Sequence, residues 1–406
     1  MKKIMICILL VFLIGCQSRT CDEKESTLCA VQVDATDRIE DGVKLRIAVE
    51  EEAYGEALVA LWNKTYPQHK DAISYGVTTA PQIYQKYMDS SSFAYDVVWG
   101  KDTYLFSFAQ HSYDMDINLL QDMEITVPNH YYENIPILYV PMRAEGMIFA
   151  YKEEKLQALG QDASIMESFE KMIEWNQEKV YFHTNYAYHV DPLLTSSFLL
   201  FQNGKDAGFD TKEFHNSLKL YKQLYQDLKL KDETTNMNNY FVTDEYVSGL
   251  VGTWMNFDGQ GLHFQKMPTY QGKQLMTMAN SYGYFIKKDT AYPNATKALL
   301  KLIRSQEGMQ AYIESSYVFP ILDEHMLETF TFQNENQKEI SDALRYSQPQ
   351  QVWGQYYNPT TSVYDIYFKT SILEQIQKYV TDEIELSDCL DEILKQQSLY
   401  IQLGKK

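Results

Sequence analysis

Acidic side chains follow two of the strands that the sequence predicts, close to the point where each strand ends. Glu51 and Glu52 come after the alternating segment Lys44–Val49, and Asp102 comes after the apolar segment Tyr95–Trp99. In a parallel α/β sheet, ligands gather outside the carboxyl ends of the strands. Ionised carboxylates accept hydrogen bonds from hydroxyls, and aromatic rings stack on the apolar faces of sugars. Because the chain has 32 Tyr, 19 Phe and 5 Trp, this combination favours a site for a hydroxyl-rich ligand such as a sugar.

Common catalytic motifs are missing from the sequence. It contains no G-x-S-x-G, no H-E-x-x-H, no phosphate-binding G-x-x-x-x-G-K and no G-x-G-x-x-G after a strand. Its eight histidines are scattered and show no metal-binding spacing with cysteine. We therefore expect a protein without enzymatic activity, metal or cofactor. A surface-anchored glycoside hydrolase stays open as an alternative, because two facing carboxyl groups cannot be recognised from sequence.

The elements that must position these side chains alternate along the chain. Strands are predicted over 44–49, 73–77 and 95–99, with helices over 56–66 and 81–89 between them. This alternation indicates a parallel α/β sheet. Further predicted elements are strands over 138–142, 147–151 and 282–286, a largely helical stretch over 164–250, and helices over 293–304 and 371–403.

Charge and length exclude some classes of protein. The 406 residues include 36 Lys+Arg and 55 Asp+Glu, for a formal net charge of −19. Nucleic-acid binding requires stripes of basic residues, so we expect no nucleic-acid partner. Electrostatic capture by anionic lipid is disfavoured for the same reason. The length predicts two domains or lobes.

An export signal occupies residues 1–15. Lys2 and Lys3 precede the apolar run Ile4–Ile14, which is shorter than the roughly 20 residues of a membrane-spanning helix. The sequence Leu13-Ile14-Gly15-Cys16 resembles the bacterial lipobox, whose cysteine becomes the lipidated N-terminus. We therefore expect an exported lipoprotein that Cys16 and its palmitate anchor to the outer face of the cell membrane. The alternative is an ordinary cleaved signal peptide.

Residues 16–44 are polar and lack apolar periodicity, which predicts a flexible tether between the lipid anchor and the globular body. Cys21 and Cys29 lie in this tether, where an oxidising exterior would permit a disulfide. Cys389 falls in an apolar helical pattern and is expected to be a buried small hydrophobe.

Several segments, taken in order, resemble a known family. They are Val97–Asp102, Tyr139–Glu145, Gly252–Asn256, Met267–Gly272, the helix 293–308 and Tyr317–Pro320. Together with the lipobox, they resemble the maltose-binding-protein-like class of family 1 extracellular solute-binding lipoproteins of ABC importers. The resemblance covers about 45–401.

This resemblance implies an α/β, two-lobed periplasmic-binding-protein-like fold of type II. Each lobe would be a sheet flanked by helices, with the ligand cleft between the lobes. The N-terminal lobe would comprise 45–144 plus 282–325, and the C-terminal lobe 147–279 plus 328–404. The chain would cross between them near Glu145–Gly146 and Asn280–Ser281, which would act as hinges.

The family's ligand contacts can be carried over position by position. They fall on Glu51, Glu52, Asp102, Glu145, Tyr188, Asp191, Trp254 or Asn256, and Tyr364. Relatives that bind maltose carry an acid followed by a lysine where this chain has Glu51 and Glu52, which argues against maltose itself.

The resemblance further implies that the chain captures a carbohydrate, such as an oligosaccharide, by hinge closure and delivers it to the permease subunits of an ABC importer. We expect a monomer. The same fold could instead bind another solute. Ferric-ion relatives use adjacent tyrosines, and this chain contains the pairs Tyr131-Tyr132 and Tyr356-Tyr357.

Overall fold

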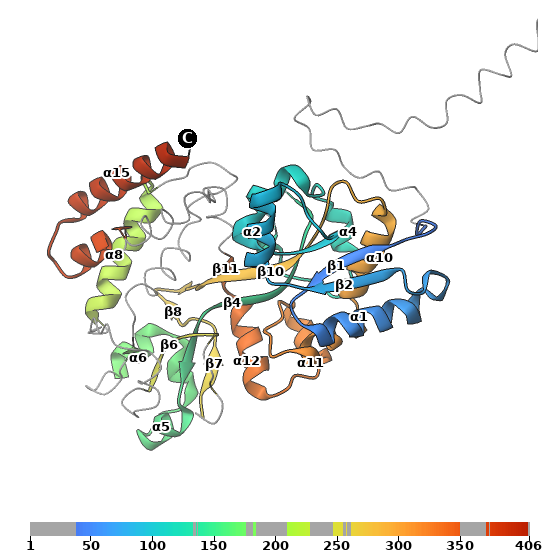
Figure 1. The fold of residues 1–406 in the computed structure, drawn as a ribbon. Coiled ribbons are helices and arrows are strands. Elements are labelled where there is room, and N and C mark those ends of the chain that lie inside the picture. The colour runs from blue at the N-terminus through green and yellow to red at the C-terminus, as the bar shows by residue number, and fades with distance from the viewer. Residues whose placement is uncertain are drawn as a thin grey trace, which may run out of the picture.

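The computed structural model describes residues 38–132, 135, 137–175, 182–183, 209–227, 247–254, 257, 261–349, 371–372 and 374–404 (Figure 1). The strands are β1 (Leu45–Val49), β2 (Ile73–Val77), β3 (Val97–Lys101), β4 (Tyr139–Tyr151), β5 (Phe182–His183), β6 (Ser248–Gly252), β7 (His263–Gln265), β8 (Thr269–Tyr270), β9 (Lys273–Gln274), β10 (Met278–Ile286) and β11 (Gln348–Pro349). The helices are α1 (Glu52–Thr65), α2 (Ala80–Ser90), α3 (Leu105–Phe108), α4 (Ile117–Gln121), α5 (Glu153–Ala158), α6 (Phe169–Trp175), α8 (Lys212–Asp227), α10 (Pro293–Ile303), α11 (Gln306–Ser315), α12 (Glu335–Leu344) and α15 (Leu386–Gly404).

One mixed sheet runs through the described part of the chain. Its strand order is β2-β1-β3-β10-β4-β6-β5, with β11 paired to β10 and β7 paired to β4. Strands β2, β1 and β3 are parallel, and β10 is antiparallel to both β3 and β4. The predicted parallel α/β arrangement of the first three strands is therefore confirmed.

Strand β4 connects the two halves of the molecule (Figure 1). Its first half pairs with β10, and its second half, from Met147 on, pairs with β6 and β7. Successive side chains of a strand point to opposite faces. Accordingly, Met147 and Phe149 belong to one hydrophobic core, while Ile148 and Ala150 belong to another.

The buried apolar side chains form two separate hydrophobic cores. The first core includes residues of β1, β3, α10 and α11, and the second includes residues of α6, α8 and the C-terminal helices. Helix α12 differs from the expectation, because its buried Ile340, Ala343 and Leu344 belong to the first core although 328–404 was assigned to the second lobe. The other lobe boundaries and the hinges stay predictions.

Local sequence explains where several elements begin. Thr79 accepts a hydrogen bond from Gln82 N, and Gln82 Oε1 accepts one from Thr79 N, so a capping box starts α2. Pro293 occupies the first turn of α10, where its missing N–H costs no helical bond. Every residue of β3 but the last is buried, which fits its continuous apolar sequence.

Three details of the predicted elements were wrong. Helix α1 begins at Glu52, four residues before the predicted start at Glu56. Residues Ser248–Gly252, at the end of the predicted helical stretch, form strand β6, because pairing with β4 overrides the local pattern. The strands predicted over 138–142 and 147–151 are one continuous strand, β4.

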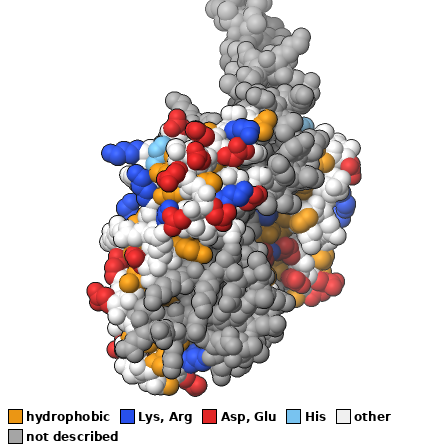
Figure 2. Space-filling view, turned by 90° about the vertical axis from the view of Figure 1, so that its left-hand side faces the viewer, with side chains coloured by type: hydrophobic (Ala, Val, Ile, Leu, Met, Phe, Trp, Pro, Cys, Tyr) orange, Lys and Arg blue, Asp and Glu red, His pale blue; other side chains and the backbone are white. Residues whose placement is uncertain are grey.

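One face of the described part of the chain carries charged side chains of both signs (Figure 2). On the face drawn in Figure 2, Asp and Glu side chains alternate with Lys and Arg among the described residues. Within the described ranges, no helix is long and apolar enough to span a membrane. Cys389 is fully buried in the second core, which confirms the prediction made for it.

Candidate functional site

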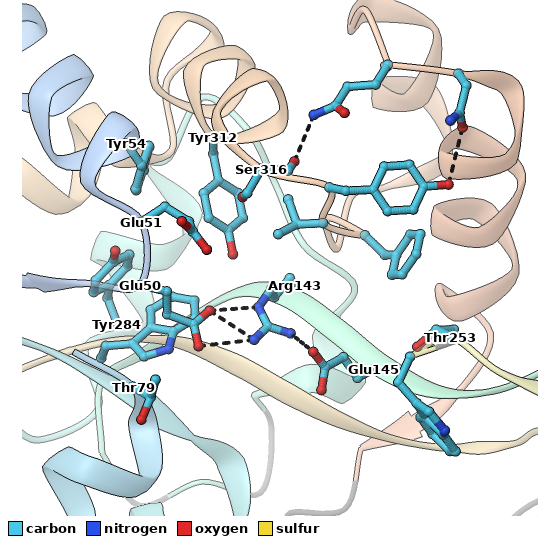
Figure 3. A pocket seen from close by; sticks show the side chains of 17 residues that line it. Glu50, Glu51, Tyr54, Thr79, Arg143, Glu145, Thr253, Tyr284, Tyr312 and Ser316 are labelled. Carbon is cyan, nitrogen blue, oxygen red and sulfur yellow. Dashed lines mark hydrogen bonds and ion pairs between the residues drawn. The ribbon is translucent and has the colours of Figure 1, made fainter. Parts of the chain in front are cut away.

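A cleft of about 760 Å³ lies where the crossing strands, β4 and β10, meet the helices of the first core (Figure 3). This volume falls in the range of small-molecule sites. The lining residues are Glu50, Glu51, Tyr54, Thr79, Trp99, Arg143, Glu145, Thr253, Trp254, Tyr284, Tyr312, Ser316, Tyr317, Val318, Phe319, Gln333 and Asn334. Most come from the turn into α1, from the crossing strands, and from the segment after α11.

Arg143 is the centre of the polar side of the cleft. Its Nη2 lies 2.9 Å from Glu50 Oε2, its Nε lies 3.0 Å from the same oxygen, and its Nη1 bonds Glu145 (Figure 3). The guanidinium also lies over the Tyr282 ring, 4.1 Å from the centroid. Glu50 follows β1 and Arg143 lies on β4, so this ion pair ties the turn into α1 to the crossing strand.

Burial and charge act in opposite directions on Arg143. Burial lowers its pKa, but the neighbouring carboxylates of Glu50 and Glu145 raise it, and the net pKa lies above its ordinary value. Arg143 is therefore positively charged, and its charge is shared between two carboxylates.

Buried polar atoms without a partner gather around this ion pair. Among the described residues, the hydroxyls of Tyr54 and Tyr312, the Nε1 of Trp99 and the Oγ of Ser316 are buried and have no hydrogen-bond partner. All four residues line the cleft. An unsatisfied buried polar group costs about 1–3 kcal/mol, so these atoms are placed to bond a ligand or water in the cleft.

The tyrosine hydroxyls keep their protons. Burial raises the pKa of Tyr54, Tyr284 and Tyr312 far above the ordinary value of tyrosine. Each hydroxyl therefore stays neutral and can both donate and accept a hydrogen bond.

Tyr317 and Phe319 add two aromatic rings to the lining of the cleft. The Tyr317 and Phe319 rings meet edge to face at 5.4 Å. The segment that carries them is held against β4, because Ala144 N donates to Phe319 O at 3.1 Å and Ile321 N donates to Met142 O at 2.9 Å.

Trp254 adds an exposed ring to the cleft from the end of β6. Its side chain is 55% exposed and packs over Gly252. Thr253 fixes this turn to the crossing strand, because Gly146 N donates to Thr253 Oγ1 at 3.1 Å and Thr253 N donates to Gly146 O at 2.9 Å.

The residues predicted as ligand contacts fall in different places. Glu51, Glu145 and Trp254 line the cleft. Glu52 lies in the exposed first turn of α1 and is not among the lining residues. Tyr188, Asp191, Asn256 and Tyr364 lie outside the described residues, as do Cys16, Cys21 and Cys29.

Asp102 needs a correction. Its side chain is fully buried and is not part of the cleft wall. Its Oδ1 accepts from Thr103 N at 2.8 Å, and its Oδ2 accepts from Ser281 N at 3.1 Å. The carboxylate therefore holds the start of the turn after β3 against β10, instead of facing a ligand.

Sequence reasoning missed several cleft residues. Arg143 and Tyr317 stood in the segments that carried the family resemblance, and Glu50 directly precedes Glu51, so position in those motifs was a usable signal. Tyr54 precedes the predicted helix 56–66, whereas it lies in the first turn of α1. Tyr312 on α11 reaches the cleft through packing against Tyr54, with ring centroids 4.9 Å apart, and no local pattern predicts that contact.

The tyrosine pair considered for ferric ion is not a cleft feature. Tyr131 is fully buried, and its hydroxyl donates to Leu344 O at 2.6 Å. Tyr132 donates to Asn129 Oδ1. Tyr356 and Tyr357 lie outside the described residues. Within the described ranges, no group of three or more His, Cys, Asp or Glu side chains is placed to hold a metal ion.

A sheet shared by two cores, with a ligand-sized cleft beside the crossing strands, defines the class of two-lobed, periplasmic-binding-protein-like folds. Residues 73–339 match the family model described as bacterial extracellular solute-binding protein. The chain belongs to this family, which implies export from the cell.

Solved structures with the same fold bind maltose-type sugars. An extracellular solute-binding protein from Staphylococcus aureus, solved with maltose, aligns with a TM-score of 0.68 at 14% identity, over 90% of this chain and 99% of that one. The maltose-binding periplasmic protein from Listeria monocytogenes, also solved with maltose, has a TM-score of 0.64 at 12% identity over 90% and 99%. The cyclic alpha-maltosyl-1,6-maltose binding protein from Arthrobacter globiformis has a TM-score of 0.64 at 14% identity over 90% and 100%. A comparison with curated proteins found no match.

Proposed function

We propose that this solute-binding protein captures a carbohydrate in the cleft and delivers it to the permease subunits of an ABC importer. The observation that carries the proposal is the pairing of exposed aromatic rings with buried polar atoms that have no partner among the described residues. Trp254 and Tyr317 supply ring faces, and Tyr54, Tyr312 and Trp99 supply hydrogen-bonding groups. Sugars need both kinds of contact.

The proposed role is binding without turnover. The carboxylates of Glu50 and Glu145 both bond Arg143, so neither of these two is free to donate a proton as the acid of a hydrolase must. Membership of a binding-protein family supports the same role. We propose that the protein acts as a monomer and needs no cofactor.

A thermal-shift screen across mono- and oligosaccharides tests this function. A saturating ligand at 100 times its Kd should stabilise the protein by roughly 2.7 kcal/mol. The sugar should be recovered unchanged by chromatography after incubation. Release of a shorter saccharide would instead support the hydrolase alternative. If none of the saccharides shifted the unfolding temperature, the proposal of carbohydrate binding would be wrong.

Trp254→Ala identifies the cleft as the site of binding. We expect an affinity loss of about five- to tenfold, since an aromatic contact with a sugar is worth about 1–1.4 kcal/mol. Leu159→Ala is the matched control, because Leu159 is also an exposed apolar side chain, at 42%, and is not a cleft residue. Equal affinities for the two variants would place the ligand elsewhere.

We also propose that binding closes the two lobes about the crossing strands, a hinge movement known for periplasmic binding proteins. The contacts proposed at Tyr188, Asp191, Asn256 and Tyr364 belong to this closed state. Small-angle scattering should show a monomer whose radius of gyration falls on saturation with the sugar. An unchanged radius at confirmed saturation would contradict closure.

Anchoring through Cys16 is a separate proposal that rests on the lipobox-like sequence Leu13-Ile14-Gly15-Cys16. In bacteria that express the full chain, the protein should partition with membranes and take up labelled palmitate. Cys16→Ser should abolish both. A Cys16→Ser protein that still incorporates palmitate would rule out this lipidation site.

A further inference from the structure

Glu51 differs from the other two carboxylates of the cleft. Glu50 and Glu145 share the guanidinium of Arg143. The Glu51 side chain is exposed, caps no backbone N–H of α1, and has no hydrogen bond or ion pair with any described residue. Figure 3 shows this side chain turned into the cleft on the same side as Tyr312. It is therefore a carboxylate available to a ligand.

The charge of the described lining is negative. Glu50, Glu51 and Glu145 are its acids, and Arg143 is its cation. The N-terminus of α1 adds about half a positive charge near Glu51, but the full negative charge of Glu51 exceeds this. The formal net charge of −19 acts in the same direction at longer range. An anionic solute would meet repulsion here, and a cationic one attraction.

A second observation shows that the site is built to hold a ligand. The hydroxyls of Tyr54 and Tyr312 and the Nε1 of Trp99 belong to side chains that are 1%, 4% and 1% exposed, and none has a partner among the described residues. In Figure 3, the Tyr312 hydroxyl points into the cleft toward the Arg143 side. These groups can bond the neutral hydroxyls of a sugar while Glu51 takes a charged substituent.

We propose that the cleft binds a saccharide bearing a protonated amine, as in an oligomer of unacetylated hexosamine, with Glu51 as the partner of the ammonium group and the buried hydroxyls of Tyr54 and Tyr312 as partners of the sugar hydroxyls. This inference rests on the proposed carbohydrate-binding function and names its substrate class. An ammonium paired with a carboxylate forms a charge-assisted hydrogen bond, roughly twice as strong as a neutral one.

The test compares two ligands that differ at the amino group of each sugar, which is charged in one and acetylated and neutral in the other. Calorimetry at about pH 6 and low salt would use a glucosamine tetramer, whose amines are protonated, and the corresponding N-acetylglucosamine tetramer, which is neutral. Maltotetraose and a galacturonate tetramer serve as a second neutral probe and an anionic probe. We expect the glucosamine tetramer to bind about tenfold more tightly than its acetylated counterpart, and the galacturonate tetramer not to bind.

Glu51→Gln keeps the shape of the side chain and removes its charge. It should erase the preference for the amine, so that the two tetramers bind the Glu51→Gln variant with affinities within about threefold of each other. Glu52→Gln is the matched control, because Glu52 is the next residue, carries the same charge and lies outside the cleft lining. It should keep the preference.

The outcomes separate this inference from the function on which it rests. Binding of maltotetraose or the acetylated tetramer without tighter binding of the amine would overturn the inference and leave carbohydrate binding intact. An amine preference that survives Glu51→Gln would also overturn it. Failure of every saccharide to bind would overturn both.

Discussion

Trp254 covers Gly252 so closely that a Cβ atom on Gly252 would lie 2.3 Å from the indole atoms Cε2 and Cζ2. Real Cβ atoms do not approach other atoms to this distance, so any side chain at Gly252 must displace the ring. Gly252 is the last residue of β6 and is buried, whereas Trp254 is half exposed. The glycine therefore determines where the exposed ring of the cleft stands.

Gly252→Ala should weaken binding of the identified sugar by about five- to tenfold, because the ring moves away from its stacking position. The free energy of unfolding should change by less than about 1 kcal/mol, since the exposed ring can swing into solvent. Isothermal calorimetry and urea unfolding measure the two effects.

The double variant Gly252→Ala/Trp254→Ala is the control for this prediction. If Gly252 acts only through the ring, the double variant should bind no more weakly than Trp254→Ala alone. Additive losses would show that Gly252 contributes in another way.

Arg143→Met should destabilise the protein by about 3 kcal/mol, because it leaves the carboxylates of Glu50 and Glu145 close together without their shared cation. Sugar affinity should fall by more than tenfold as the polar side of the cleft rearranges. Urea unfolding and calorimetry provide the measurements.

Adding Glu50→Gln to Arg143→Met should restore part of the lost stability, because it removes one of the two unpaired charges. The unfolding free energy of the double variant should therefore lie above that of Arg143→Met. If the changes in unfolding free energy caused by the two substitutions were additive, Glu50 and Arg143 would not be energetically coupled.

How far the sequence predicts this molecule depends on the range of the interactions involved. The first strands and helices follow from local periodicity, and Pro67 and Pro293 help to mark the ends of helices. Strand β6 could not be predicted, because its conformation depends on pairing with β4, about 100 residues earlier. Tyr312 was missed for the same reason, because its place in the cleft depends on a contact with Tyr54, which is distant in the sequence.

Asp102 shows a different limit. Its position after β3 was predicted correctly, but position at a strand end does not determine the direction of a side chain. Two backbone N–H groups, of Thr103 and Ser281, need acceptors, and the carboxylate satisfies both from inside the protein. Glu51 and Glu145, placed by the same reasoning, do line the cleft.

Arg304→Lys should destabilise the protein by about 2–4 kcal/mol. The Arg304 side chain is fully buried, and its guanidinium donates to the carbonyls of Ile125 at 3.0 Å, Thr126 at 2.9 Å and Ile321 at 3.3 Å. Burial lowers its pKa to about 9. A lysine has no planar fork and cannot reach these diverging acceptors together, so buried carbonyls lose their partners.

Urea unfolding checks this prediction, with Arg38→Lys as control. The Arg38 side chain is 73% exposed, and its replacement should change stability by no more than about 0.5 kcal/mol. Since Arg304 is not a cleft residue, the sugar affinity should stay unchanged under conditions in which the variant is fully folded. A large affinity loss with little change in stability would contradict a structural role.

Asp102 should make stability depend on pH in mildly acidic solution. Burial raises the pKa of its carboxyl from the ordinary value of 3.8 to about 6, against the lowering effect of Lys101. A carboxyl whose pKa is higher in the folded state binds its proton more tightly there, so protonation stabilises the fold. This contribution is complete below about pH 4 and is lost as the pH rises through about 6. The shift corresponds to about 3 kcal/mol at most.

Asp102→Asn removes this titration. The variant should lose less stability than the parent between about pH 4 and pH 7. Its absolute stability should be lower, because Thr103 N and Ser281 N bond different oxygens of Asp102, and an amide has only one. Urea unfolding across this pH range measures the difference between the two proteins. Asp41→Asn, at a carboxyl that is 88% exposed, should leave the parent's pH dependence unchanged. A parent and Asp102→Asn variant with parallel profiles would show that Asp102 does not titrate in this window, and the raised pKa would have to be abandoned.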